Sequence, residues 1–168
     1  MSFYSYILNN IIFITPLLVT AMLSIVSILP IMPNGTEEIA PLLGVISLSF
    51  WIVHRPDLMG WTSVICIGIF NDILYGTIFG TACLSAIFIR LVLIKILSKL
   101  DPINIFHTLF YISLSLLIWL LFSNVIRTLI YFDFYNYYNS IFQFFVSIVI
   151  SPIIIFIQLF LLKKMSIN

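Results

Sequence analysis

Apolar runs, separated by short breaks rich in Pro, Gly and charged residues, occupy nearly the whole chain. The run FFVSIVISPIIIFIQLFLL, residues 144–162, is typical, with polar side chains only at isolated positions. A helix needs about 20 mostly apolar residues to cross a bilayer. The pattern predicts six such helices, at residues 11–31, 39–53, 58–76, 81–98, 104–130 and 140–162.

The composition is that of an integral membrane protein. Hydrophobic residues make up 62% of the 168 positions and charged residues only 8%, whereas soluble domains carry about 25% charged residues. The apolar segments leave no room for a soluble domain. We therefore expect an all-α integral membrane protein, with residues 1–168 forming a single domain, a compact bundle of six transmembrane helices.

The first apolar run, residues 11–31, resembles a secretory signal in its position. However, no Lys or Arg precedes it, it is longer than the apolar core of a signal peptide, and no A-x-A-like cleavage site follows it. We expect this segment to be retained as the first transmembrane helix.

Basic residues near the predicted helix ends are distributed unevenly, which indicates an orientation in the membrane. With six helices, both termini lie on the same side as the second and fourth loops. That side carries Arg55, Lys95, Lys99, Lys163 and Lys164. The loops of the opposite side carry Glu37, Glu38 and Asp133 and neither Lys nor Arg. Both termini are therefore expected in the cytoplasm.

The segment YFDFYNYYN, residues 131–139, then lies on the outer side. Its tyrosines have apolar rings and polar tips, which suit the headgroup layer of a bilayer. Aromatic side chains also dominate protein–protein hot spots. The segment is therefore interpreted as an interfacial belt or as a docking surface for an outer partner, and the two readings are compatible.

Three ionisable residues lie deep in the predicted helices: Asp72, Arg90 and Arg127. Burying such a group costs about 2.5–3.5 kcal/mol on insertion scales, so it normally faces protein or a watery cavity and finds a partner. Asp72 and Arg127 are expected at similar depths near the outer side, which favours an ion pair between them. Arg90, although deeper, could reach Asp72 by extending outward.

Asp72 is flanked by glycines at a spacing of four, Gly68 and Gly76, so the three lie on one helical face. Small residues at this spacing allow two membrane helices to approach closely. Asp72 is also the only acid within the predicted spans, and a transport relay would use several. The pattern favours a helix-packing role for the carboxylate.

Catalytic and metal-binding patterns are not evident in the sequence. No GxSxG, HExxH or paired-carboxylate motif occurs. His54 and His107 lie near predicted helix ends, and Cys66 and Cys83 form no CxxC pair. We expect no enzymatic activity, no metal and no cofactor, and the net charge of +1 gives no indication of nucleic-acid binding.

The stretch HRPDLMGWTSVICIGIFNDILYGTIFGTACLSAIFIRLV, residues 54–92, resembles MreD, the rod shape-determining membrane protein family of bacteria. The similarity comprises an Arg-Pro pair followed by G-x-x-x-D-x-x-x-G-x-x-x-G, a basic residue in the next helix, and a last helix with a central proline and a Lys-Lys end. In this chain these are Arg55, Pro56, Gly68, Asp72, Gly76, Gly80, Arg90, Pro152, Lys163 and Lys164.

The resemblance implies an architectural role in the bacterial cytoplasmic (inner) membrane. Members of the family belong to the elongation complex that directs peptidoglycan synthesis and cell shape. The implied direct partner is MreC, a membrane-anchored coiled-coil protein, and the indirect partners are MreB, RodA and a transpeptidase. The structural or partner-binding residues are then Arg55, Pro56, Gly68, Asp72, Gly76, Gly80, Arg90 and Pro152, and Arg127 joins them through its expected pairing with Asp72.

A second resemblance supplies an alternative function. The same family looks like the substrate-binding subunit of energy-coupling-factor vitamin transporters, which shares a six-helix fold. A small-molecule-binding subunit would need a cavity lined by aromatic and a few polar residues. Trp119, Asn124 and Arg127 are the candidates for that lining.

Overall fold

The computed structural model describes residues 3–29, 40–97, 105–131 and 137–167. All regular secondary structure in these ranges is helical, as the sequence predicts, and no strand occurs in them. The six helices found there are α1 (Phe3–Ile28), α2 (Leu43–His54), α3 (Trp61–Tyr75), α4 (Thr81–Leu97), α5 (Ile105–Tyr131) and α6 (Tyr137–Ile167).

The helix bounds differ from the predicted ones most at the two ends of the described chain. α1 begins at Phe3 instead of residue 11, and α6 ends at Ile167 instead of residue 162. Hydropathy marks the membrane-compatible part of a helix, and a helix can continue past it into polar sequence. Several residues used to predict the orientation and the outer loop lie outside the described residues: Glu37, Glu38, Lys99, Asp133 and the segment 132–136.

Two of the helices are, by length and composition, long and apolar enough to cross a membrane. They are Ile105–Ile130 of α5 and Tyr138–Met165 of α6, with mean hydropathies of 2.1 and 2.7. Shorter apolar helices are present at Ile14–Ile28, Leu43–His54 and Trp61–Tyr75. The predicted apolar character of the chain is therefore confirmed, and two spans have the required length.

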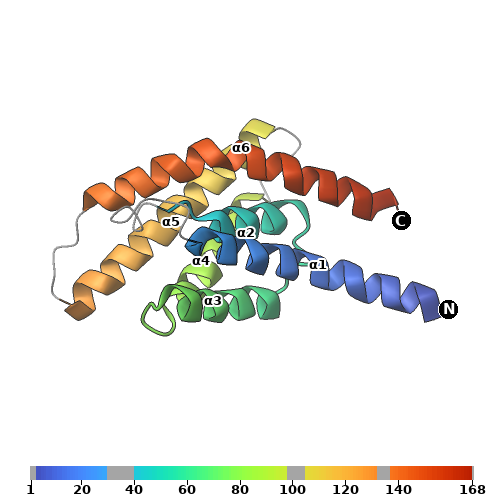
Figure 1. Cartoon of the computed structure of the whole chain (residues 1–168), viewed down its shortest axis with the longest axis horizontal. Helices are drawn as coiled ribbons and strands as arrows, with labels where there is room; N and C mark the ends of the chain where they lie inside the picture. Colours follow the sequence, from blue (N-terminus) through green and yellow to red (C-terminus); the bar gives the residue numbers. More distant parts are fainter. Residues whose placement is uncertain (1–2, 30–39, 98–104, 132–136, 168) are drawn as a thin grey trace.

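α2 is the central helix of the bundle (Figure 1). Residues 43–53 are all buried, and α1, α4, α5 and α6 pack around them. At 1.5 Å per residue a helix of 12 residues is only about 18 Å long. A helix of this length is short enough for its neighbours to cover it completely.

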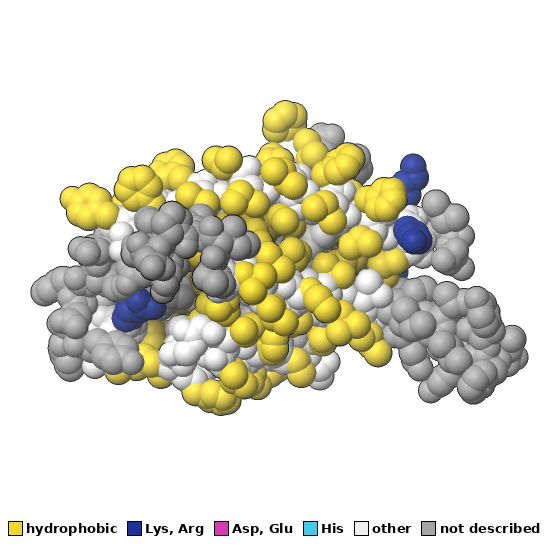
Figure 2. All heavy atoms as spheres, viewed as in Figure 1, with side chains coloured by type: hydrophobic (Ala, Val, Ile, Leu, Met, Phe, Trp, Pro, Cys, Tyr) yellow, Lys and Arg dark blue, Asp and Glu magenta, His cyan; other side chains and the backbone are white. Residues whose placement is uncertain are grey.

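The other five helices expose apolar side chains. Met22, Ile73, Leu121 and Phe156, from four different helices, are 62–73% exposed. Figure 2 shows hydrophobic side chains covering the face in view, with the visible Lys and Arg side chains toward its two ends. Exposed apolar patches on soluble monomers seldom exceed a few hundred Å², so this surface is typical of contact with lipid or with other proteins.

The interior, by contrast, contains many polar side chains. Thr20 of α1, Ser47 of α2 and Gln158 of α6 are fully buried and form one chain of hydrogen bonds. Ser47 Oγ lies 3.0 Å from Thr20 Oγ1 and 2.5 Å from Gln158 Nε2. Hydrogen bonds between small polar residues are a common means of joining helices inside membranes.

Successive helices run in alternating directions (Figure 1). The start of α1 and the end of α6 lie at one end of the molecule, here called the terminal end, together with the 55–60 turn between α2 and α3. The 76–80 turn between α3 and α4 lies at the opposite end, here called the distal end. The end of α5 and the starts of α2 and α6 are also at the distal end.

α6 bends near its middle (Figure 1), where Pro152 lies inside the helix. A proline in a helix interior lacks the N–H for the backbone hydrogen bond and crowds the preceding turn. The side chain of the neighbouring Ser151 bonds back to Ile148 O at 2.8 Å. Pro152 thus has a structural role in shaping the longest helix, and it lies away from the distal end.

Candidate functional site

The Asp72 carboxylate, on the last turn of α3, is almost completely buried, with 2% of the residue exposed. It accepts hydrogen bonds from four donors. Oδ1 receives Thr77 Oγ1 and Ala82 N, both at 2.8 Å. Oδ2 receives Gly80 N at 2.9 Å and Cys83 N at 3.4 Å. The carboxylate therefore binds the 76–80 turn and the beginning of α4.

These donors explain why an acid occurs at this position. The first N–H groups of any helix have no acceptor within the helix, and an unsatisfied one is costly where water is absent. Ala82 N and Cys83 N are such groups in α4. A negative charge at a helix N-terminus is also favourable for the helix dipole. Asp72 thus caps α4 from the preceding helix, and we call this arrangement the Asp72 lock.

Gly68 allows α3 and α4 to approach closely, as the sequence predicts. A Cβ atom at this position would lie 2.5 Å from Cys83 Cα and 3.1 Å from Cys83 N. Both are backbone atoms, which cannot move aside as a flexible side chain can. Any residue larger than glycine would therefore push the two helices apart at the level of the lock.

Gly76 and Gly80 form the turn between α3 and α4, and Gly76 does not have the close-packing role that its spacing from Gly68 predicts. A Cβ atom at either position would meet nothing within 4 Å, so neither glycine is needed for close packing. Both have positive φ, 58° at Gly76 and 100° at Gly80, a region that favours glycine. Gly76 ends α3 in the left-handed conformation, with its N–H bonded to Asp72 O. The two glycines shape the turn that brings donors to Asp72.

The described contacts of Asp72 include no ion pair with Arg127 or Arg90, the partners that the sequence favoured. The described partners of the carboxylate are all groups of the turn and of α4. Backbone N–H groups at the start of α4 satisfy the charge locally, so no cation is required. The sequence-based expectation compared the depths of charged side chains in the membrane and took no account of the backbone N–H groups at the start of α4.

Arg90 serves the opposite end of the same two helices. It is 7% exposed, its Nη1 donates to Met59 O, and its Cζ lies 5.0 Å from the centre of the Trp61 ring. The cation therefore attaches α4 to the connection that leads into α3. Arg55 and Pro56 begin that connection. Arg55 N bonds to Trp51 O at the end of α2, and Arg55 O accepts from Leu58 N and Met59 N.

The start of α2 is also capped by side chains of other helices. Leu43 N donates to Ser27 Oγ of α1, and Leu42 N donates to Ser147 Oγ of α6, both at 3.1 Å. Gln143 of α6 donates to Ala40 O at 2.9 Å. At the distal end, therefore, the beginnings of α2 and α4 both receive their caps from neighbouring helices.

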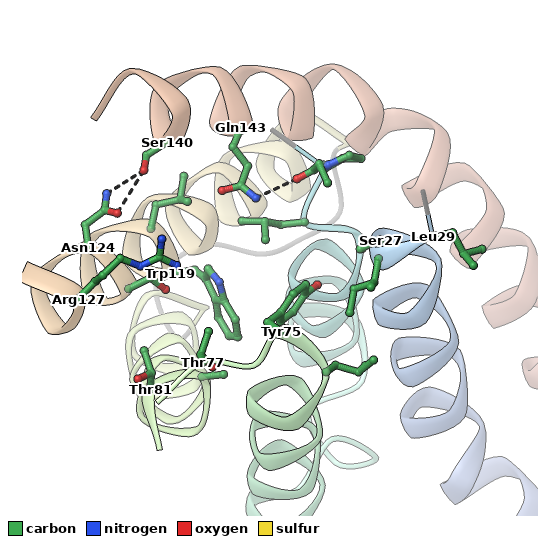
Figure 3. Close-up of a pocket in the computed structure, with 18 residues that line it drawn as sticks. Ser27, Leu29, Tyr75, Thr77, Thr81, Trp119, Asn124, Arg127, Ser140 and Gln143 are labelled. Atoms are coloured by element: carbon green, nitrogen blue, oxygen red, sulfur yellow. Dashed lines mark hydrogen bonds between the residues drawn. The ribbon is translucent and has the colours of Figure 1, made fainter. Parts of the chain in front are cut away.

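A cavity of about 610 Å³ lies between these helix ends (Figure 3). Residues from α1, α3, α4, α5 and α6 and from the segment before α2 line it. Trp119, Asn124 and Arg127, the lining expected for the alternative function, are all among them. Asn124 bonds to Ser140 of α6 at 3.0 Å, which joins α5 to α6 at the rim. A smaller cavity of about 200 Å³ adjoins the 76–80 turn and shares Thr77 and Arg127 with the larger one.

Sequence reasoning missed the serines that cap α2 and the contribution of Tyr75 and Gln143 to the cavity. Single serines in apolar runs are common, and many only bond back to their own helix, as Ser49 does to Val45 O. The available signal was position, because Ser27 and Ser147 lie near helix ends that the pattern predicts to be at the same side. No group of three or more His, Cys, Asp and Glu suited to a metal ion is present among the residues that the structure describes.

Comparison of the chain with protein-family models, curated proteins and solved structures finds no match. Function is therefore argued from the residues and their geometry.

Proposed function

We propose that the protein is a non-catalytic, multi-pass scaffold of the bacterial cytoplasmic membrane that belongs to the cell-wall elongation complex and binds MreC. The proposal joins the sequence resemblance to MreD with the geometry of the residues that carry it. In this view the charge and glycine pattern of residues 68–90 builds a rigid helical hairpin, and the exposed surfaces meet lipid and partners.

The proposal includes six membrane crossings with both termini in the cytoplasm. Support comes from the alternating helix directions, the apolar surface of five helices and the polar interior. The short helices α2, α3 and α4 fit such a bundle because neighbours cover α2 and buried caps satisfy the starts of α2 and α4. Arg55, Lys163 and Lys164 belong to the terminal end, in agreement with a cytoplasmic location there.

The observation that carries the scaffold proposal is the Asp72 lock. The Asp72 carboxylate, the buried acid of the motif, accepts hydrogen bonds from four donors. Gly68 allows the close contact of α3 with α4, and Gly76 and Gly80 shape the turn between them. A carboxylate held in this way is suited to fixing a shape rather than to exchanging protons or binding substrate. A fixed hairpin surface is what a membrane partner needs for recognition.

The partner test is co-purification from the bacterium that encodes the chain. Tagged wild-type protein, solubilised in mild detergent, is expected to retain an MreC-type protein, a single membrane anchor followed by a coiled coil. Depletion is expected to round the cells and disperse sites of wall synthesis. Expression of Gly60→Ala should restore rod shape, whereas Asp72→Ala should not. Normal shape and wall growth after depletion would refute the scaffold proposal.

Topology is tested separately by reporter fusions. A reporter fused after Lys164 should be active only if it functions in the cytoplasm, and one inserted in the 76–80 turn only if it functions outside. The reverse pattern would refute the proposed orientation while leaving the helix packing unaffected.

The cavity at the distal end favours a second candidate function, a small-molecule-binding subunit of a membrane transporter. A volume of about 610 Å³ falls within the range of roughly 300–1,000 Å³ that ligand sites occupy. The discriminating observation is a small molecule that co-purifies with the wild-type protein, detected by mass spectrometry, and that is absent when the cavity is filled by Ser123→Phe.

A further inference from the structure

We propose that the distal cavity is an anion site: it binds a small molecule or headgroup that carries a carboxylate or phosphate on a flat apolar body. This goes beyond the scaffold role. It deepens the second candidate function and rests on that function's premise that the cavity takes a ligand.

The charge of the described lining is one-sided. Arg127 contributes a guanidinium, and the lining residues that the structure describes include no Asp or Glu. The nearby Asp72 carboxylate does not line the cavity, and its charge is compensated by its four donors. A guanidinium has several N–H donors in a fixed plane, so it can keep its present contacts and still bind an oxyanion.

Neutral hydrogen-bonding groups line the cavity together with the cation: Asn124 and Ser123 of α5, Thr81 of α4, Thr77 of the turn and Ser140 of α6. The hydroxyl protons of Thr77 and Ser140 are already donated, to Asp72 and to Asn124. The hydroxyls of Ser123 and Thr81 and the second amide N–H of Asn124 can donate to the oxygens of an anion and fix its orientation. The polar groups are contributed by several helices, as is usual for a site that closes around a ligand.

Aromatic side chains provide a surface for a flat body. In Figure 3 the Trp119 ring projects into the space between α5 and α3, with Tyr75 beside it and the Arg127 side chain extending toward Trp119. Trp119 is only 5% exposed, so its ring is held by packing and forms the floor of the cavity, and the half-buried Tyr75 offers more open ring surface. Packing of a flat body against these rings and pairing with the guanidinium would use both features of the cavity at once.

The position of the cavity leaves two sources for the anion. Five helices and the start of α2 converge on it, so a soluble molecule can enter along the axis of the bundle. In the proposed membrane orientation the same depth corresponds to lipid headgroups, whose phosphates offer the same chemistry. Both sources need Arg127.

The test uses the full chain in phosphatidylcholine nanodiscs. The probe is 2-naphthoate, and the matched neutral probe is 2-naphthamide. Equilibrium dialysis, corrected with empty nanodiscs, should show saturable binding of the naphthoate and binding at least tenfold weaker for the amide. Loss of a charge-assisted hydrogen bond weakens affinity by about tenfold to a hundredfold, so Arg127→Gln should raise the dissociation constant by that factor.

Control variants keep the result interpretable. Lys164→Gln removes one positive charge from an exposed position at the terminal end of α6, far from the cavity, and should leave binding unchanged. Arg127→Lys should retain part of the affinity. Ser123→Phe fills the cavity without changing charge and should abolish binding, which provides a second line of evidence if Arg127→Gln does not fold.

The lipid arm identifies the source of the natural anion. If naphthoate binds at least tenfold more tightly in dodecyl maltoside micelles, which contain no phosphate, than in phosphatidylcholine nanodiscs, the lipid headgroup occupies the site, and if the affinity is unchanged, the ligand is soluble. Equal affinity for naphthoate and naphthamide, or an unaltered dissociation constant in Arg127→Gln, would overturn the anion inference alone. No saturable binding of either probe would overturn the inference and the second candidate function together, whereas the scaffold proposal is decided by cell shape.

Discussion

The two ends of the α3–α4 hairpin each bury a charged side chain, and they satisfy its charge differently. At the distal end the Asp72 carboxylate accepts from four donors, three of them backbone N–H groups. At the terminal end the Arg90 guanidinium donates to one backbone carbonyl and lies over one ring, and its Nε has no hydrogen-bond partner among the described residues.

The difference shows which end of the hairpin depends more on its charged residue. Backbone N–H groups at the start of α4 have no other acceptor, so removing Asp72 leaves several of them unsatisfied. Removing Arg90 leaves a single acceptor without its donor, the carbonyl of Met59, whereas Asp72 serves four donors. We therefore expect substitutions at the distal end to destabilise the protein more than equivalent ones at the terminal end.

The largest effect is expected for Asp72→Ala. Several buried donors lose their acceptor, each at about 1–3 kcal/mol if it stays unsatisfied, which suggests a loss of about 3–5 kcal/mol in the free energy of unfolding. Asp72→Asn, which keeps one acceptor oxygen, should cost less. The measurement is the SDS-induced unfolding of purified protein in mixed micelles. Asp57→Ala, an exposed acid in the other turn, is the control and should be nearly neutral.

Gly68→Ala should have the next largest effect. The added methyl group overlaps the backbone of Cys83, and overpacking of this kind typically costs about 1–3 kcal/mol. Gly60→Ala is the matched control, because a Cβ there meets only Thr62 Oγ1 at 4.0 Å. Rescue of Gly68→Ala by Cys83→Ala would contradict the account, since the clash is with backbone atoms that this second change keeps.

Arg90→Met should be milder than either. It removes the hydrogen bond to Met59 O and the contact with Trp61 while keeping an unbranched apolar chain, at a cost of about 1–2 kcal/mol. The same unfolding assay applies, with Arg90→Lys as the variant that retains the charge. If Arg90→Met destabilised the protein more than Asp72→Ala, the ranking of the two ends would be reversed.

Gly76→Ala should cost about 1–2 kcal/mol, close to the strain of one L-residue in the left-handed region. The position has φ 58° and open space around it, so backbone strain is the only penalty. Gly76→Asn should cost less than Gly76→Ala because asparagine tolerates this conformation better. Equal losses for the two variants would indicate a packing role instead.

The smallest expected effect is the coupling free energy between Asp72 and Arg90, at the two ends of the α3–α4 hairpin. Asp72 and Arg90 share no described partner, so the losses of Asp72→Asn and Arg90→Met should add to within about 0.5 kcal/mol. The same holds for Asp72→Asn with Arg127→Gln. A coupling well above that in either double-mutant cycle would restore the ion pair that the structure replaces with backbone donors.

Much of the fold follows from the sequence because apolar runs and Pro or Gly breaks report directly on helices. The helical class and the six segments agree with the structure, and the end of α3 at Gly76 shows how well a glycine marks a turn. α1 extends to Phe3 because helix formation continues beyond the apolar part that the pattern detects.

The site was only partly predictable. The pattern indicated that Asp72 joins helices, but its partners are backbone N–H groups, which every residue has and no sequence signal distinguishes. Trp119, Asn124 and Arg127 could be assigned to one lining because they share a helix. Tyr75 and Gln143 reach the same cavity from α3 and α6, and only the packing of the helices reveals this.

The most direct test of the Asp72 lock is amide hydrogen exchange at three residues, in nanodiscs, for the wild type and Asp72→Asn. Gly80 N and Ala82 N donate to the carboxylate, whereas Leu58 N donates to Arg55 O in the other turn. We predict that exchange at Gly80, Ala82 or both becomes at least tenfold faster in the variant while Leu58 changes little. Unchanged exchange at Gly80 and Ala82, or an equal increase at Leu58, would contradict the lock.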